Sequence, residues 1–227
     1  MGRIGHRLSG IEKLVEVGVA MHEPIERARA THGGAVRQAE AIGYPVALKV
    51  NSPDIMHKTD VDAIRLGLRT ASAIESAFEE IMRSVDDRCP DAEVRRILVQ
   101  EMVPPGIELI LGVKRDPVFG PMILCGLGGI HTEILRDFAM RRAPVDRETA
   151  AEMLGELRGY KLLKGARGSD TADIDALIDA IVSLSNVAVR AGEWIEELDI
   201  NPLIVLPQGS GCIVADAQIQ CISRNEQ

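Results

Sequence analysis

Short apolar runs of strand length alternate along the chain with segments of helical periodicity, and this alternation restricts the fold more than any other feature. Residues 46–50 and 121–125 are runs of the strand kind, whereas residues 72–85 and 173–190 repeat apolar side chains at helical spacing. The alternation is typical of a mixed α/β (α+β) protein. A length of 227 residues suffices for one large domain or two small lobes.

Turn and capping residues indicate where the elements begin and end. Residues 32–42 are predicted to form a helix closed by Gly43, and residues 64–69 are predicted to form a strand. Ser72 and Glu75 have the spacing of a capping box, so the next helix is expected to begin there.

In the C-terminal half, Asp146 is expected to cap a short helix. Strands at residues 96–102 and 108–114 are predicted to pair around a Pro-Pro-Gly turn. Two final strands are predicted to flank a turn at residues 207–211.

The chain is expected to pass between two lobes near residues 100–104. The predicted N-terminal lobe comprises residues 1–100, of which residues 1–20 are partly irregular. The predicted C-terminal lobe comprises residues 101–227 and contains no internal repeat.

Composition excludes several classes of function. The formal net charge is −8 and no Lys/Arg block stands out, so a nucleic-acid partner is not expected. A nucleotide needs only a few local donors and usually brings its own Mg²⁺. The N-terminal residues lack the apolar core expected of a signal peptide, and no run of the sequence has the length expected of a membrane span. Its four cysteines have no C-x-x-C spacing, which favours a reduced, cytoplasmic chain with structural thiols and disfavours a zinc site.

Two candidate sites lie close together in the N-terminal half. Lys49 is a lone ammonium group in an apolar strand, where it either needs an anion nearby or extends its head to solvent. The following loop holds His57, Lys58 and Thr59, which supply a base, a cation and a hydroxyl group. A neutral histidine can accept a phosphoryl group. The alternative is a polar surface loop.

A third candidate is the glycine-rich segment at residues 126–129, which follows a predicted strand. Gly128 and Gly129 would let backbone N–H groups converge on an anion, although tight turns use glycine for purely steric reasons too. Glu133, further along, would face either a metal or water.

The most informative segment lies near the C-terminus. Strand alternation places Asp199 and Asn201 on one face, and Asp216 is expected on the neighbouring strand. Two carboxylates and an amide oxygen are hard ligands suited to Mg²⁺. The alternative is a hairpin edge with solvated acids, but acids beside apolar strands favour a metal site.

Four segments together resemble the ATP-grasp β subunits of ADP-forming acetate–CoA ligases and the C-terminal ATP-grasp part of fused NDP-forming acyl-CoA synthetases. They are residues 43–61, 96–129, 160–168 and 197–205. The similarity extends over nearly the whole chain and is specific because the segments occur jointly and in order. It implies an ATP-grasp fold, in which two lobes clamp a nucleotide.

The resemblance also implies roles for nucleotide-binding residues. Lys49 is expected to contact the phosphates of ATP or ADP. Glu101, Met102 and Val103 are expected to line the adenine slot with their backbone groups, and Glu108 to reach the ribose.

For the reaction itself, the resemblance implies that Asp199, Asn201 and Asp216 bind Mg²⁺. His57 falls on the histidine proposed to relay a phosphoryl group in these ligases. A CoA-binding α subunit, or an equivalent domain, is the expected partner and carries the main phosphohistidine.

This chain departs from the family pattern at two places. Where the family usually has Asp-Val-Gly-Gly-Val, the chain has Asp62 and Ala63 in place of the two glycines, which adds a negative charge where phosphates are expected. His131 stands where relatives commonly carry an aromatic or apolar residue. Two alternatives to a catalytic subunit therefore stay open: a nucleotide-binding regulatory module with weakened chemistry, and a purely structural subunit.

Overall fold

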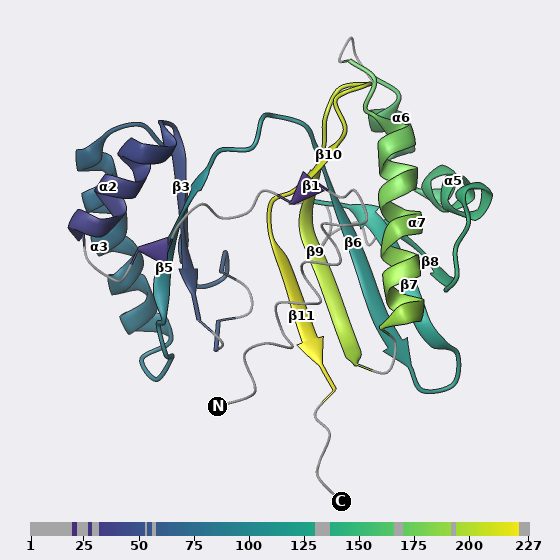
Figure 1. Cartoon of the computed structure of the whole chain (residues 1–227), viewed down its shortest axis with the longest axis horizontal. Helices are drawn as coiled ribbons and strands as arrows, with labels where there is room; N and C mark the ends of the chain where they lie inside the picture. Colours follow the sequence, from purple (N-terminus) through teal and green to yellow (C-terminus); the bar gives the residue numbers. More distant parts are fainter. Residues whose placement is uncertain are drawn as a thin grey trace, which may run out of the picture. The chain divides into compact units, whose positions relative to one another are not determined.

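The computed structural model describes residues 20–21, 27–28, 32–52, 54–55, 58–129, 137–165, 170–191 and 194–222. The chain divides into two compact units, Glu23–Met102 and a C-terminal unit made of Val103–Gln227 with Met1–His22. Each unit is built on one β-sheet that carries its helices on one face (Figure 1). The expectation of a mixed α/β protein is confirmed.

The unit Glu23–Met102 contains a four-stranded sheet in the order β2-β5-β3-β4, and all of its neighbouring strands are antiparallel. Among the described residues of this unit, two helices pack on the sheet. The elements are β2 (Arg27–Ala28), α2 (His32–Ile42), β3 (Val46–Asn51), β4 (Ile64–Leu68), α3 (Ala71–Arg88) and β5 (Arg96–Glu101).

The core of this unit lies between the sheet and the two helices. Leu48 and Val50 of β3 pack in one cluster with Ile74 and Ile81 of α3, and all four are fully buried. Strand alternation turns the residue between Leu48 and Val50 to the other face. The apolar spacing of α3 therefore fixes which face of the sheet the helices cover.

The start of α3 differs from the expectation. Thr70, and not Ser72, is the N-cap, because its hydroxyl oxygen accepts a hydrogen bond from the backbone N–H of Ala73 at 3.1 Å. Threonine, like serine, is a favoured N-cap residue, so two residues within a span of three could have capped this helix. The helix ends at Arg88, ahead of Pro90.

The C-terminal unit contains a seven-stranded sheet in the order β1-β10-β9-β6-β7-β8, with β11 paired to β9 as well. Only the short pair β1–β10 is parallel among the described strands. The strands are β1 (Ala20–Met21), β6 (Ile107–Asp116), β7 (Gly120–Leu127), β8 (Phe138–Arg142), β9 (Ile195–Val205), β10 (Cys212–Val214) and β11 (Ala217–Cys221).

Helices α5 (Arg147–Glu156) and α7 (Ile174–Arg190) cover one face of this sheet, and the short α6 (Tyr160–Leu163) lies beside them (Figure 1). Their apolar faces join one core cluster with alternate residues of β6, β7 and β9. As expected, Asp146 caps α5 through the N–H of Thr149. Asp173 caps α7 through the N–H of Ala176.

The boundary between the units departs from the expected 1–100 and 101–227 in two ways. The break falls after Met102, and Met1–His22 group with the C-terminal unit. The reason lies in β1, which pairs with β10 of the C-terminal sheet. The expectation that strands near residues 96–102 and 108–114 pair with each other is wrong, because β5 and β6 belong to different sheets.

The four cysteines are free thiols, and burial raises the pKa of Cys125 and of Cys212 to about 12. These two thiols are therefore protonated and unreactive near neutral pH. Within the described residues, none of the helices has the length and apolar character needed to cross a membrane.

Asp173 should contribute measurably to stability. Its carboxylate accepts the N–H of Ala176 at 3.2 Å and that of Gly211 at 2.8 Å, joining the start of α7 to the turn before β10. We expect Asp173→Ala to lower the free energy of unfolding by about 1–2 kcal/mol at pH 7, the usual effect of losing a cap. Denaturant unfolding monitored by circular dichroism measures this loss.

The difference between wild type and D173A should shrink at low pH. The hydrogen bond from Gly211 is the largest cause that lowers the pKa of Asp173. A carboxylate with a lowered pKa stabilises the fold above its unfolded pKa of about 4 and loses this effect as pH falls through the folded pKa. Asp175→Ala in the same helical turn, whose side chain is 84% exposed, is the control and should change stability by less than about 0.5 kcal/mol. Equal losses in both variants would contradict the assignment.

Candidate functional site

Lys49 lies in the middle of β3, opposite Ile64 of β4 and Leu98 of β5. Its neighbours Leu48 and Val50 point into the core under the helices, so Lys49 points from the helix-free face of the sheet. Only 6% of the residue is exposed. Gln100, also buried, sits on the same face, because its strand partner is Ala47. An ammonium group buried to this degree requires nearby oxygen or anionic partners.

The segment before β4 forms a turn that ends beside Lys49. The N–H of Ala63 donates to the carbonyl of Lys58 at 2.7 Å, and the N–H of Asp62 donates to the carbonyl of Thr59 at 3.1 Å. The carbonyl of Ala63 in turn accepts the N–H of Val50 at 3.1 Å. Strand pairing thus brings the predicted phosphate-loop residues Lys58 and Thr59 next to the strand of Lys49. His57 lies outside the described residues.

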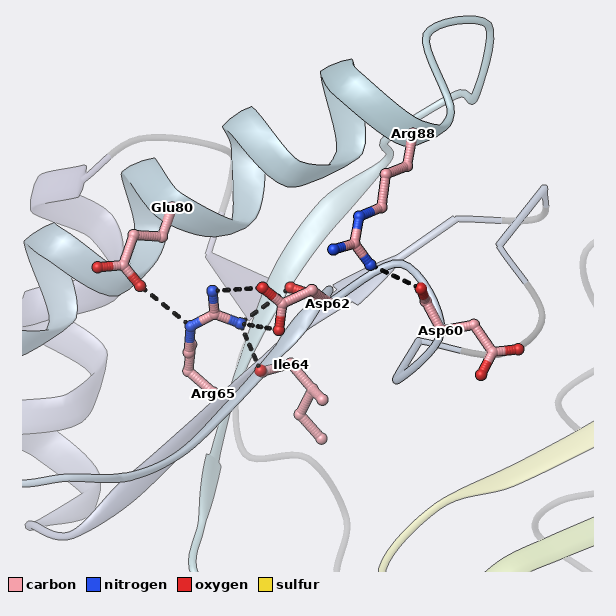
Figure 2. A network of polar contacts seen from close by, with 6 residues as sticks. All are labelled: Asp60, Asp62, Ile64, Arg65, Glu80 and Arg88. Carbon is pink, nitrogen blue, oxygen red and sulfur yellow. Dashed lines mark hydrogen bonds and ion pairs between the residues drawn. The ribbon is translucent and has the colours of Figure 1, made fainter. Parts of the chain in front are cut away.

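Asp62 has a backbone φ of +55°, the left-handed region where glycine is favoured. Its carboxylate is ion-paired with Arg65 at 2.8 Å, and Arg65 also contacts Glu80 of α3 at 3.1 Å (Figure 2). The negative charge that Asp62 adds to this turn is therefore compensated within the unit. The sequence did not single out Arg65, although an arginine three residues after an aspartate is a recognisable signal.

Glu101, Met102 and Val103 follow β5 directly. The N–H of Met102 donates to the carbonyl of Pro45 at 3.4 Å, and its sulfur accepts the N–H of Gly67 at 3.3 Å. Glu101 shares the parity of the core residue Val99, so its exposed side chain leaves the sheet on the helix-covered side. A group on the helix-free face of the sheet could therefore contact the backbone of Glu101 but not its side chain.

In the C-terminal unit, Glu108 and the glycine pair after β7 lie in contact. The N–H of Gly128 donates to the carbonyl of Glu108 at 2.7 Å. A Cβ atom on Gly128 would lie 2.9 Å from the carbonyl carbon of Glu108, so no larger residue fits there without movement. Gly129 has a φ of +74°, and a Cβ there would lie 3.4 Å from Oε2 of Glu108. The sequence named these residues separately and did not reveal their contact, which depends on the pairing of β6 with β7. His131 and Glu133 lie outside the described residues.

Asp199 and Asn201 project from the same face of β9. Leu198 and Ile200 belong to the core under the helices, so alternation places the two polar residues on the helix-free face. Asp199 stands opposite Gly112 of β6, which has no side chain, and opposite Gln218 of β11 on its other side. Glu108 is on this face too, since it has the parity of Gly112 on β6.

Asp216 lies in the break between β10 and β11, not within a strand as expected. Both of these strands pair with β9, and the break faces Asn201 and Pro202. The N–H of Asn201 donates to the carbonyl of Asp216 at 3.1 Å, and the N–H of Ala215 donates to the carbonyl of Pro202 at 3.0 Å. Pro202 has no N–H to donate, which explains why the regular ladder stops here.

The three predicted magnesium ligands therefore come from facing segments of one sheet. Two carboxylates and one amide oxygen, half-buried or exposed, match the oxygen ligands that Mg²⁺ prefers. Within the described part of the chain, no group of three or more His, Cys, Asp or Glu side chains forms a metal-binding cluster.

Comparison with known proteins agrees with this architecture. The sequence profile of the ATP-grasp domain matches residues 14–221. The β subunit of ADP-forming acetate–CoA ligase II from Pyrococcus furiosus is 40% identical over 196 residues, which cover 86% of this chain and 83% of the relative. ADP-forming acetate–CoA ligase I from Archaeoglobus fulgidus is 46% identical over 171 residues, which cover 75% of this chain but 25% of that longer protein.

Solved structures give the same result. The dinucleotide-forming acetyl-coenzyme A synthetase 1 of Candidatus Korarchaeum cryptofilum, in complex with coenzyme A, Ca-AMPCP and HgCl⁺, superposes with a TM-score of 0.86 at 39% identity. The match covers 94% of this chain and 91% of that one. A protein from Pyrococcus horikoshii has a TM-score of 0.86 at 35% identity, and the match covers 96% of this chain and 91% of that one. Because its fold, its extent and its sequence agree with these proteins, the chain belongs to the ATP-grasp family.

Proposed function

We propose that the chain is the nucleotide-binding subunit of an ADP-forming acyl-CoA synthetase. In this reaction an acyl-CoA, ADP and phosphate are converted reversibly to the free acid, ATP and CoA. The observation that carries the proposal is the 40% identity to an acetate–CoA ligase β subunit over 83% of its length. This relative is named as a β subunit, which supports a subunit role for this chain.

The proposed nucleotide-binding residues come from both units. Lys49 and the turn with Lys58 and Thr59 serve the phosphates, and the backbone of Glu101, Met102 and Val103 serves the adenine. Glu108 is proposed to bind the ribose. Gly128 and Gly129, which contact Glu108, are proposed to bind the phosphates. The support is that Lys49 and Glu108 project from helix-free faces, where a ligand meets no packed helix, and that both glycines contact Glu108.

Asp199, Asn201 and Asp216 would hold a Mg²⁺ ion, which supplies charge neutralisation for the phosphates when bound. Phosphoryl transfer depends mainly on alignment and on such neutralisation. The carboxylates of Asp199 and Asp216 supply negative charge for the cation, and Lys49 supplies positive charge for the nucleotide.

His57 is proposed as the relay. A neutral ring nitrogen of His57 forms a P–N bond as the phosphoryl group leaves the partner's phosphohistidine, whose own P–N bond breaks. The terminal phosphate oxygen of ADP then takes the phosphoryl group, forming the P–O bond of ATP and freeing His57. The transfer needs no oxidant or reductant.

The proposed partner is a CoA-binding α subunit, since the β-subunit relatives are named as parts of a ligase. The identity of the acid depends on that partner. A cytoplasmic location agrees with the free cysteines. No role with nucleic acid or membranes is proposed.

Reconstitution tests the function directly. We expect ATP to form from a short acyl-CoA, ADP and phosphate only when this chain and the CoA-binding chain are both present, as measured by a coupled assay over a panel of acyl-CoAs. Mg·ADP binding without turnover on any of them would favour the regulatory module. The absence of any Mg²⁺-dependent thermal shift with ADP or ATP would favour a structural subunit.

Replacement of His57 separates chemistry from binding. His57→Ala should lower ATP formation by at least about a hundredfold, because the group that accepts the phosphoryl is lost. The affinity for Mg·ADP, measured by calorimetry, should stay within about twofold. His32→Ala at the start of α2 is the control and should leave both quantities unchanged. Lost ADP binding in a folded H57A chain would instead identify His57 as a binding residue.

Replacement of Asp216 tests the metal site. Asp216→Asn should raise the Mg²⁺ concentration needed for half-maximal ADP binding by about tenfold or more, because metal sites lose at least this much when a supporting group is removed. A titration of Mg²⁺ at fixed ADP measures the shift.

The matched control is Glu197→Gln. Glu197 lies on the same face of β9 as Asp199, but its carboxylate contacts Lys114 at 3.6 Å. The E197Q variant should need the same Mg²⁺ concentration as wild type for half-maximal ADP binding. An unchanged requirement in D216N would remove Asp216 from the metal site.

A further inference from the structure

Arg65 is the centre of a polar network on the helix-covered side of the sheet in the unit Glu23–Met102 (Figure 2). Its guanidinium group contacts both carboxylate oxygens of Asp62, at 2.8 and 3.0 Å, and the carboxylate of Glu80 at 3.1 Å. It also donates to the carbonyl oxygens of Asp62 and Ile64, at 2.9 and 3.0 Å. Through these five contacts, Arg65 holds the backbone of the turn and neutralises the charge of Asp62.

The network and Lys49 lie on opposite faces of the sheet. Arg65 is the strand partner of Leu48, a core residue, so its side chain leaves β4 towards α3. Lys49 is the partner of Ile64 and leaves the sheet on the other side. The contact with Arg65 therefore holds the Asp62 carboxylate away from the face that presents Lys49.

A second contact from α3 secures the same turn. Nη1 of Arg88 donates to the carbonyl of Asp60 at 2.8 Å (Figure 2). Together with Glu80, which holds Arg65, it ties the turn to the helix at two points along α3. The hydrogen bond to Asp62 is the largest cause that raises the pKa of Arg65, so the guanidinium stays charged at every physiological pH.

We infer that Arg65 is a positioning residue for nucleotide binding, which keeps the Asp62 carboxylate paired on the helix side and so holds the turn from Lys58 to Ala63 in place. The inference rests on the proposed function, because the phosphates of a nucleoside diphosphate are the group the turn would serve. Without Arg65, the carboxylate is free to approach the phosphates and to repel them.

Four forms of the full chain test this role: wild type, R65A, D62N and R65A/D62N. We expect R65A to raise the dissociation constant of Mg·ADP by about three- to fivefold, the upper part of the range for a partly screened charge interaction. D62N should stay within about twofold of wild type, because asparagine tolerates a positive φ and carries no charge. The double variant R65A/D62N should recover part of the loss, since no carboxylate remains to be released, although the hydrogen bonds from Arg65 to the carbonyls of Asp62 and Ile64 are still missing.

Salt provides a second check on the same binding measurement. The defect of R65A should shrink as NaCl rises, because the liberated charge is exposed to screening. R95A is the matched control: Arg95 is an exposed arginine of the same unit that contacts Glu93 at 3.5 Å. It removes the same charge and should leave the affinity unchanged.

Hydrogen exchange tests the positioning role without any ligand. In R65A, the amides of Asp62 and Ala63, which donate within the turn, should exchange at least about tenfold faster than in wild type. The core amides of α3 should keep their protection, and R95A should match wild type throughout.

The outcomes separate this inference from the proposed function. A wild-type chain that binds no Mg·ADP refutes the proposed function, and with it the role of Arg65 in nucleotide binding. Unchanged amide exchange in R65A overturns the positioning role whatever the chain binds. The claim that Arg65 neutralises the charge of Asp62 is overturned if R65A binds Mg·ADP as tightly as wild type. It is also overturned if R65A/D62N loses as much affinity as R65A.

Discussion

Burial of one face of each sheet is the constraint on which the rest of the structure depends. In both units the helices cover a single face, and the apolar residues of the strands alternate so that they meet those helices. Leu198 and Ile200 must pack in the core, and this forces Asp199 and Asn201 to the other face. A shift of one residue in β9 would bury an aspartate in the core, which costs several kcal/mol. The packing that stabilises the fold therefore also fixes where the polar residues point.

The ladder around β9 stops being regular where the polar residues gather. The register with β6 shifts between Leu109 and Leu111, and the partners on the other side change from β10 to β11 at Asn201 and Pro202. Proline explains the local break because it lacks an N–H group. The irregular backbone brings Asp216 against Asn201, which a continuous strand pair would not require. An interruption of this kind is a common way to aim side chains at a ligand.

Local signals made part of this architecture predictable from the sequence. The helix His32–Ile42 and the cap Asp146 were predicted because the deciding contacts lie within four residues. Strand partners were not predictable in the same way, since pairing joins distant segments. The sequence thus suggested that β5 and β6 pair, and it did not reveal that Glu108 touches Gly128. The individual polar residues could be named from the sequence, but their neighbours required the sheet order.

Asp62 illustrates how a residue that looks unfavourable in the sequence can be accommodated by its surroundings. A positive φ at a residue other than glycine costs about 1 kcal/mol or slightly more. Its ion pair with Arg65, and that of Arg65 with Glu80, each contribute about 0.2–1 kcal/mol because the groups are partly exposed. These magnitudes are comparable, so the network offsets the backbone strain without adding much net stability. The larger effect of the network is on where the charges lie. The carboxylate of Asp62 is held on the helix-covered side of the sheet, and Lys49 projects from the opposite, helix-free face.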